Sequence, residues 1–334
     1  MTKNDEKKEQ AAEAPKPFME RLKHQVKEFV IVFGGFLLLN NFVVASFLVP
    51  TGSMENEVMT GDFLMVNKFL YGASTPRNIM FTNVRLPWTT LPGFRDVERG
   101  DVIVFEFPGY REEVNPSEFT FYLKRCMALA GDTLEVRNRV VYVNGEQAPL
   151  PKNMKFNFSP KPAGYADDRI FPPTAPFNED HYGPVVVPKK GMSVPLTPAT
   201  FAQWKTVIER EGHAAAQLAD GTVLVDGVRA DSYTVQRDYV FGMGDNRDNS
   251  LDSRFWGFIP REYVVGTPMF VYFSVADTRE YAAELYVKGE SLRMEWIYTT
   301  FSGHNILLDI VAKAFLVVFN PEMVRFGRIG YVIG

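Results

Sequence analysis

A serine follows a turn-forming sequence near the start of the chain, in Pro50-Thr51-Gly52-Ser53-Met54. Proline ends a helix and glycine permits a sharp bend, so this pattern predicts an exposed hydroxyl on a rigid turn. A serine nucleophile needs such a turn together with hydrogen-bond donors for an oxyanion. The Ser53 backbone N–H and the Thr51 hydroxyl are the candidate donors. An ordinary turn has the same sequence, so the assignment depends on a partner base.

Lys124 is the candidate base. It lies in the mostly apolar segment Phe119–Leu129, where strand alternation places it on one face with Tyr122 and Cys126. Burial on an apolar face penalises the charged ammonium and lowers the lysine pKa, and a neutral amine can accept the proton of a serine hydroxyl. A lysine at a strand edge that extends its amine to water fits the same pattern. The strand context alone leaves both interpretations open.

A dense polar segment, Gly242–Arg254, lies between apolar runs. Its acidic and basic side chains predict a network of charge-assisted hydrogen bonds, formed by Asp245, Arg247, Asp248, Asp252 and Arg254. A calcium loop does not fit, because Ser253 stands where that motif needs glycine and Ile259 where it needs glutamate.

Metal and cofactor sites have little support in the composition. The chain has a single cysteine, Cys126, which we expect to be a buried apolar residue, and four dispersed histidines. These numbers exclude a disulfide framework and a multi-cysteine zinc site. The 36 basic and 40 acidic residues give a net charge of −4, which makes no electrostatic case for nucleic acid. We expect no metal, no cofactor and no nucleic-acid partner.

The elements that must position these residues are mainly β. Short runs rich in Val, Ile, Phe and Tyr recur, bounded by turn residues such as the Gly-Asp pairs, and predict strands. The runs are Phe63–Val66, Val102–Phe107, Phe119–Leu129, Val140–Val143, Val223–Val225, Tyr239–Met243 and Met269–Phe273. The 334 residues allow about two folded units.

We divide the part after the first 49 residues into three regions. Residues 50–144 and 233–276 form the predicted catalytic β-domain. Residues 145–232 contain several prolines and a predicted amphipathic helix at Ala199–Glu211, and we interpret them as an inserted accessory subdomain. Residues 277–334 form a C-terminal extension. Within this extension, Asn305–Phe319 predicts a helix packed on the domain or at the membrane interface, because its two charged residues would each cost about 2.5–3.5 kcal/mol in the bilayer.

An uncharged run from Phe29 to Val49 predicts a membrane anchor, because about 20 apolar residues cross a bilayer. We expect a tail at residues 1–27, disordered over 1–17, and a single transmembrane helix at residues 28–49. A cleavable signal peptide is the competing interpretation, which the long tail of mixed charge disfavours.

The basic residues flanking this run indicate its orientation. Arg21, Lys23 and Lys27 precede the run, whereas Pro50–Met65 contains no Lys or Arg. The positive-inside rule therefore places the N-terminus in the cytoplasm and the β-domain outside it. The aromatic stretch Leu86–Phe94 is a further candidate for contact with the bilayer interface, with an ordinary exposed hairpin as the alternative.

Taken in chain order, these motifs resemble those of the type I signal peptidases, bacterial membrane-anchored serine proteases that remove signal peptides from exported preproteins. The serine turn, the strand beginning Gly61-Asp62, Arg99–Phe105, Tyr122–Arg125 and the polar segment all take part in the resemblance. Val324–Ile329 is similar to a degraded form of the family's terminal segment. Thr51 stands where many members carry serine, and Glu55-Asn56-Glu57 replaces a proline-containing continuation.

The resemblance implies specific roles. Ser53 would be the nucleophile, Lys124 the general base, Ser250 the residue that orients the lysine amine, and Thr51 an oxyanion-hole donor. The loop architecture would depend on Asp245, Arg247, Asp252 and Arg254. The substrates would be preproteins with small residues before the cut, and the enzyme would lie in the bacterial inner membrane with its catalytic domain on the extracytoplasmic side.

Two other functions share some of these features. A non-catalytic anchored β-domain would leave Ser53 and Lys124 apart or misaligned. A self-cleaving repressor uses the same Ser/Lys chemistry, but the predicted anchor and the lack of a DNA-binding helix-turn-helix argue against it.

Overall fold

The computed structural model describes the chain except for residues 1–17, 79–83, 117–118, 289, 291–313 and 315. The predicted disordered tail at 1–17 and ten of the fifteen residues of the predicted helix Asn305–Phe319 lie outside the described residues, whereas residues 314 and 316–319 are helical.

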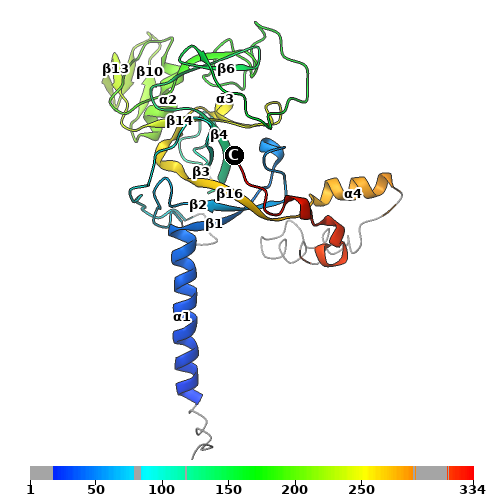
Figure 1. Ribbon diagram of the computed structural model, residues 1–334. Helices are drawn as coiled ribbons and strands as arrows, with labels where there is room; N and C mark the ends of the chain where they lie inside the picture. The colour runs from blue at the N-terminus through cyan, green and yellow to red at the C-terminus, as the bar shows by residue number, and fades with distance from the viewer. Residues whose placement is uncertain (1–17, 79–83, 117–118, 289, 291–313, 315) are drawn as a thin grey trace, which may run out of the picture.

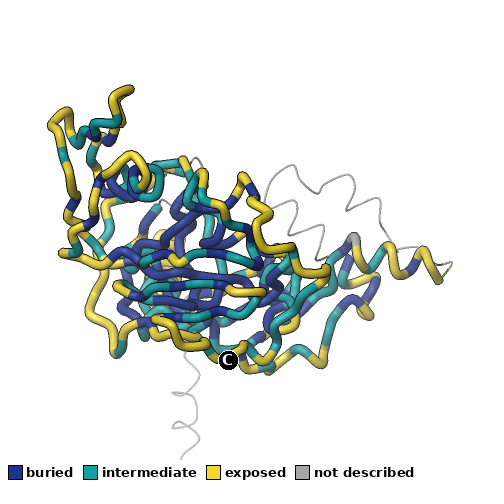
Figure 2. The backbone as a smooth tube through the Cα atoms, turned by 90° about the horizontal axis from the view of Figure 1, so that it is seen from above, coloured by how far each residue is buried: buried dark blue, intermediate teal, exposed yellow. Residues whose placement is uncertain are grey.

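A seven-stranded antiparallel sheet forms the centre of the molecule and confirms the predicted β-rich class (Figure 1). Its strands, in spatial order, are β1 (Val44–Leu48), β2 (Asp62–Asn67), β16 (Val264–Ser274), β3 (Val102–Glu106), β4 (Phe121–Ala128), β14 (Tyr239–Met243) and β15 (Ile259–Pro260). All five residues of β3 are buried, as expected for a strand covered on both faces. Figure 2 shows that the buried backbone is concentrated in the middle of the molecule and the exposed backbone at its edges.

Three smaller sheets and a helix lie at the end of the molecule opposite α1 (Figure 1). They comprise β5 (Thr133–Arg137), β6 (Val140–Val143), β7 (Glu146–Gln147) and β8 (Tyr182–Val186); β10 (Ala215–Gln217), β11 (Val223–Val225) and β12 (Val228–Arg229); β9 (Ser193–Pro195) and β13 (Ser232–Thr234); and α2 (Phe201–Arg210). Helix α2 confirms the predicted amphipathic helix, because Phe201, Trp204 and Ile208 share its buried face.

The boundary predicted at residue 145 does not coincide with a break in the packing. Strand β8, inside the predicted insert, pairs with β5 of the predicted catalytic domain. A single hydrophobic cluster also contains Leu134, Val185 and Phe241. A separate accessory subdomain at 145–232 therefore stays a prediction.

Helix α1 (Phe18–Phe42) projects alone from the sheet and buries none of its residues (Figure 1). Helix α1 ends at Phe42, whereas the predicted transmembrane helix covers residues 28–49. The prediction of a helix is therefore wrong for the last part of that range. Val44–Leu48 leaves the helix and pairs with β2, with Val44 opposite Asn67, because these residues gain a ladder of backbone hydrogen bonds in the sheet. Within the described residues, no helix combines the length and apolar character needed to cross a membrane.

The described part of the C-terminal extension runs beside β16. It contains α4 (Thr278–Val287) and the 3₁₀ turns η3 (Pro321–Met323) and η4 (Phe326–Arg328), and bridges pair Val324 with Val275 and Val332 with Phe270. The other short elements are α3 (Ser253–Trp256), η1 (Gly52–Met54) and η2 (Arg261–Tyr263).

Asp62 connects this extension to the sheet. Its carboxylate is fully buried and accepts hydrogen bonds from Arg328 Nη2 at 2.6 Å, Ser274 Oγ at 2.6 Å and the Met59 backbone at 2.9 Å. Burying a carboxylate is costly unless such partners surround it. The contacts of Asp62 therefore hold η4 against β2 and β16.

Replacing Asp62 with alanine should destabilise the fold strongly, because it removes a buried acceptor shared by Arg328 Nη2 and Ser274 Oγ. We expect the free energy of unfolding to fall by about 3–5 kcal/mol, measured by thermal or denaturant unfolding. Asp231, whose side chain is 86% exposed, is the matched control, and Asp231→Ala should leave stability nearly unchanged. Equal stability of the two variants would contradict this account of Asp62.

Candidate active site

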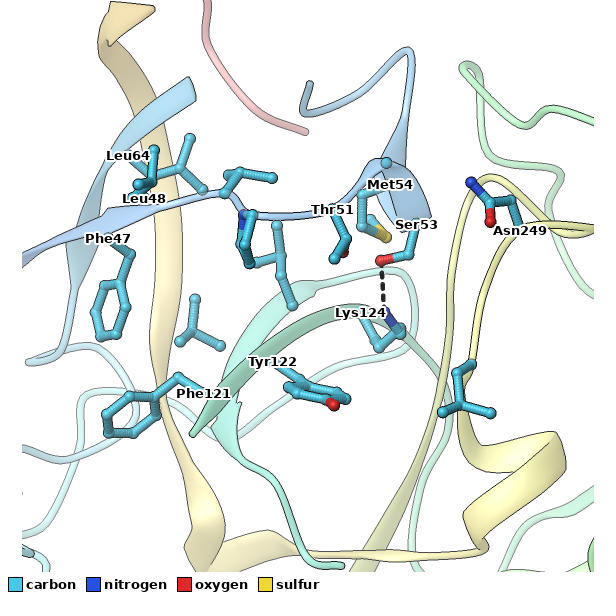
Figure 3. Close-up of a pocket in the computed structure, with 16 residues that line it drawn as sticks. Phe47, Leu48, Thr51, Ser53, Met54, Leu64, Phe121, Tyr122, Lys124 and Asn249 are labelled. Atoms are coloured by element: carbon cyan, nitrogen blue, oxygen red, sulfur yellow. Dashed lines mark hydrogen bonds between the residues drawn. The ribbon is translucent and has the colours of Figure 1, made fainter. Parts of the chain in front are cut away.

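Ser53 and Lys124, 71 positions apart in the chain, meet in the structure (Figure 3). The Lys124 Nζ atom donates a hydrogen bond to Ser53 Oγ at 2.6 Å. Lys124 is only 3% exposed, so the predicted location on an apolar face is confirmed and the solvent-extended alternative is wrong. The non-catalytic interpretation, which required the two residues to be apart, loses its geometric basis.

Room for the lysine stem comes from the neighbouring strand. Lys124 lies opposite Ile103 of β3, and β4 pairs on its other edge with β14. Gly242 of β14 has no side chain at this point, and a Cβ there would lie 3.1 Å from the Lys124 Cβ. The small residue therefore allows the lysine to pass β14 on its way to Ser53.

Burial lowers the Lys124 pKa to about 8. The charges of Asp252 and Asp245 oppose this shift and Arg254 reinforces it. An ordinary lysine is almost wholly charged at neutral pH, whereas Lys124 is half neutral near pH 8. Its amine can therefore act as a proton acceptor at accessible pH.

Two ion pairs organise the polar segment around the site. Arg125, the residue after the lysine, donates to Asp245 at 2.7 Å, and Arg254 donates to Asp252 at 2.8 Å. Burial alone would raise the Asp252 pKa, but the Arg254 charge and hydrogen bonds to the carboxylate outweigh it, and the pKa is lowered. Asp252 also accepts from the Gly244 N–H at 3.0 Å.

The Arg247 side chain does not take part in the predicted network of charged residues, so this part of the prediction is wrong. Asp245 pairs with Arg125 instead, and Asp248 accepts from Arg139 and from the backbone N–H groups of residues 157 and 158. In the described structure, the Arg247 guanidinium has no ion pair and its Nε no hydrogen-bond partner. Burial lowers its pKa to about 10. Arg247 contributes through its backbone, whose carbonyl accepts from Arg254 at 2.8 Å.

Ser250 lies beside the serine turn. A Cβ on Gly244 would approach Ser250 Oγ to 2.2 Å and the Ser53 carbonyl to 2.5 Å, so glycine is required where these segments meet. The buried Ser250 hydroxyl has no hydrogen-bond partner among the described residues. Ser250 therefore lies close to the serine turn but makes no hydrogen bond to Lys124. The role of Ser250 in orienting the Lys124 amine stays a prediction.

The candidate oxyanion donors lie at the start of η1. Thr51 precedes this turn with extended backbone dihedrals and an exposed side chain, close to Ser53 in Figure 3. The N–H groups at the start of a helical turn have no partner within the turn and can bind an anionic oxygen. Figure 3 shows the Thr51 side chain near the Ser53 hydroxyl. The oxyanion-hole roles of Thr51 and the Ser53 N–H stay a prediction.

Asn246 is a site residue that the sequence analysis did not single out. Its backbone N–H donates to the Ser53 carbonyl at 3.1 Å, and its side-chain Nδ2 donates to the Gly52 carbonyl at 3.0 Å. Asn246 therefore fixes the backbone of the turn that contains Ser53. Its place in the polar motif was the available signal, but nothing in the sequence distinguished it from its polar neighbours.

A mainly apolar cleft of about 430 Å³ extends from Ser53 and Lys124 (Figure 3). Its lining comes from β1 and the segment after it, from β2, β3 and β4, and from the polar loop: Phe47, Leu48, Val49, Pro50, Thr51, Gly52, Ser53, Met54, Leu64, Val104, Phe121, Tyr122, Leu123, Lys124, Asn249 and Leu251. Phe47 and Phe121 lie toward one end of the cleft and Asn249 toward the other, with the dyad between them.

Comparison with known proteins shows the family to which the chain belongs. The family described as signal peptidase, peptidase S26, matches residues 22–273. The chain therefore belongs to the signal peptidase family, peptidase S26. Its activity is that of a hydrolase that cleaves signal peptides.

Proteins named signal peptidase I are similar over most of the chain. The Helicobacter pylori protein is 28% identical over 72% of this chain and 78% of its own. The Aquifex aeolicus protein is 28% identical over 76% of this chain and 85% of its own. The Pseudomonas aeruginosa protein is 29% identical over 76% of this chain and 73% of its own. A crystal structure of a signal peptidase I from Enterococcus faecalis aligns at 19% identity with a TM-score of 0.23, over 52% of this chain and 97% of that one.

Proposed function

We propose that Ser53 is the nucleophile and Lys124 the general base of signal peptide cleavage. The neutral Lys124 amine takes the proton of the Ser53 hydroxyl as Oγ attacks the scissile carbonyl. The resulting lysine ammonium gives this proton to the leaving amine, and an ester of Ser53 remains. Lys124 then takes a proton from the water that attacks the ester and returns it to Ser53 Oγ as the bond between Oγ and the acyl carbon breaks, which restores the serine hydroxyl and the neutral amine. The 2.6 Å contact between a buried amine and the serine carries this proposal.

The surrounding groups would stabilise and align this reaction. The Ser53 N–H and the Thr51 hydroxyl would donate to the oxyanion, and Ser250 would orient the lysine amine. Asp245, Asp252 and Arg254 would hold the loop through the ion pairs described above, and Arg247 through its backbone. The chemistry balances with protein groups and water alone.

The substrate would be a preprotein that lies extended along the cleft, with small residues at the first and third positions before the cut. Side chains of β1 and β4 such as Phe47, Leu48 and Phe121 line the walls. An apolar wall built from large side chains leaves shallow pockets, which accept alanine and exclude bulk.

We also propose that α1 attaches the enzyme to the bacterial inner membrane, with the N-terminus in the cytoplasm and the sheet outside. Large apolar side chains of α1, such as Val32 at 72% and Leu38 at 62%, are exposed, a state that lipid would relieve. Leu91 and Phe94 are also exposed, at 50% and 73%, and support contact of Leu86–Phe94 with the interface.

Removal of either dyad group tests the catalytic roles. Ser53→Ala and Lys124→Ala should each abolish cleavage of a model preprotein while far-UV circular dichroism remains native. Ser232→Ala and Lys190→Ala, at exposed positions, should retain full cleavage. Full activity in either dyad variant would overturn the proposal.

The pH dependence tests the protonation state of Lys124. Because the base must be neutral, kcat/KM for cleavage should rise with pH and level off above an apparent pKa of about 8. Single-turnover assays from pH 6 to 10 would measure this profile. A rate that is constant over the whole range would exclude Lys124 as the titrating base.

Charges in α1 test the attachment. Replacing Ile31 and Leu38 together by aspartate should prevent flotation of the protein with phosphatidylethanolamine–phosphatidylglycerol vesicles, since each charge in the bilayer core costs about 2.5–3.5 kcal/mol. The same replacements at Val228 and Leu218, which are exposed, should leave flotation intact. Unchanged flotation of the α1 variant would argue against attachment through this helix.

A further inference from the structure

An acidic turn, Glu55-Asn56-Glu57, follows the nucleophile, and the proposed reaction does not use it. Glu57 is 3% exposed and lies four positions after Ser53. Its backbone N–H donates to the Met54 carbonyl at 3.1 Å, so it belongs to the same compact turn as the nucleophile. A buried carboxylate at this position needs partners to offset its lost hydration.

Both oxygens of the Glu57 carboxylate are acceptors. Oε2 accepts from Asn153 Nδ2 at 2.6 Å, and Oε1 accepts from the Gly334 N–H at 2.9 Å. Arg125 Nη2 lies 3.8 Å from Oε2. These three groups each present a donor to the carboxylate, and a side chain that accepts at both atoms satisfies all of them.

Asn153 belongs to a segment that also contacts the polar loop, and we call residues 153–157 the arm. The Lys155 N–H donates to the Asp245 carbonyl at 2.8 Å, and the Arg247 N–H donates to the Lys155 carbonyl at 2.9 Å. Asn157 Nδ2 donates to Asn246 Oδ1 at 2.7 Å. The arm is thus bonded to the loop along its length.

All three residues of the acidic turn, Glu55, Asn56 and Glu57, are also bonded to the arm. Lys155 Nζ lies 2.9 Å from Glu55 Oε2, and Asn56 Nδ2 donates to the Asn153 carbonyl at 3.5 Å. Glu55 Oε2 accepts in addition from Asn246 Nδ2 at 3.0 Å. The Glu55–Lys155 pair is partly exposed and adds little stability by itself, whereas the Glu57–Asn153 bond is short and buried at the carboxylate.

We propose that Glu57 and Asn153 are positioning residues for Ser53: the arm clamps the acidic turn to the polar loop and thereby fixes the nucleophile relative to Lys124. This inference rests on the proposed role of Ser53. Neither residue touches the reacting atoms. They act through the turn, whose displacement by about 1 Å would be enough to lower the rate about 100-fold.

Glu57→Gln is the sharpest variant, because it changes the size of the side chain very little. Its amide NH₂ must face either the Asn153 amide or the Gly334 N–H, both donors. We expect kcat for preprotein cleavage to fall about 100-fold with little change in KM. The apparent pKa of the pH profile should stay near 8, because the burial of Lys124 is unchanged.

An exchange of the two groups should restore activity. In the double variant Glu57→Gln/Asn153→Asp, the glutamine NH₂ can donate to the new carboxylate and its oxygen can still accept from Gly334. We expect the double variant to recover most of the lost kcat, whereas Asn153→Asp alone, which places two carboxylates together, should be impaired.

Glu211→Gln is the matched control. Glu211 is a buried carboxylate in the region of α2, where it accepts from Tyr233 and Tyr239. Its variant should lose thermal stability but keep its kcat per folded molecule. If Glu57→Gln fails to fold, Asn153→Ala, at a half-buried position, takes its place and should show the same loss of kcat.

Wild-type kcat in Glu57→Gln, or a loss that the exchange does not repair, would overturn the positioning role. If Ser53→Ala is inactive in the same assay while Glu57→Gln is normal, only this inference fails. If Ser53→Ala is active, the proposed nucleophile itself is wrong.

Discussion

The structure depends on one constraint: an amine must be removed from water and held against a serine hydroxyl. In the folded chain the Lys124 pKa falls from 10.5 to about 8. At about 1.4 kcal/mol per unit, keeping the lysine charged below pH 8 costs roughly 3 kcal/mol, and this cost disappears as the pH rises toward 10.5. The surrounding sheet must supply this energy through its own packing. Fully buried residues on the adjacent strands, such as Ile103 and Phe241, provide such packing.

The two carboxylates near Lys124 are each paired with an arginine, which offsets their negative charge. Asp245 and Asp252 favour the ammonium, but each is bound by its own arginine, Arg125 or Arg254. Pairing limits how far the two carboxylates can raise the lysine pKa against the effect of burial. The same pairs satisfy donors of the polar loop, so the network that stabilises the loop also leaves a proton acceptor in the cleft.

The active site is a junction of segments that are distant in the chain. The turn with the proposed nucleophile connects β1 to β2, and the proposed base lies on β4. The polar loop follows β14, and the arm comes from the region predicted as an insert. Asn246 and Asn153 bond the turn from two sides. In the acidic turn, contacts that stabilise the fold also determine the position of Ser53. The C-terminal segment contributes to these contacts through the Gly334 N–H, which donates to Glu57.

The sequence alone determined the β-rich class and the family resemblance, because strand-length apolar runs and short motifs are local signals. The turn-borne hydroxyl and the lysine in an apolar run made Ser53 and Lys124 candidates, and only the resemblance selected them. The sequence did not determine where the N-terminal helix ends, since strand pairing with β2 outweighs the apolar character of Val44–Leu48. The sequence also placed the Arg247 side chain in the charged network, which is wrong, and indicated no role for Asn246 or Glu57. Those roles depend on which donors face which acceptors across the fold, and only the tertiary structure decides such pairings because the partners are remote in the chain.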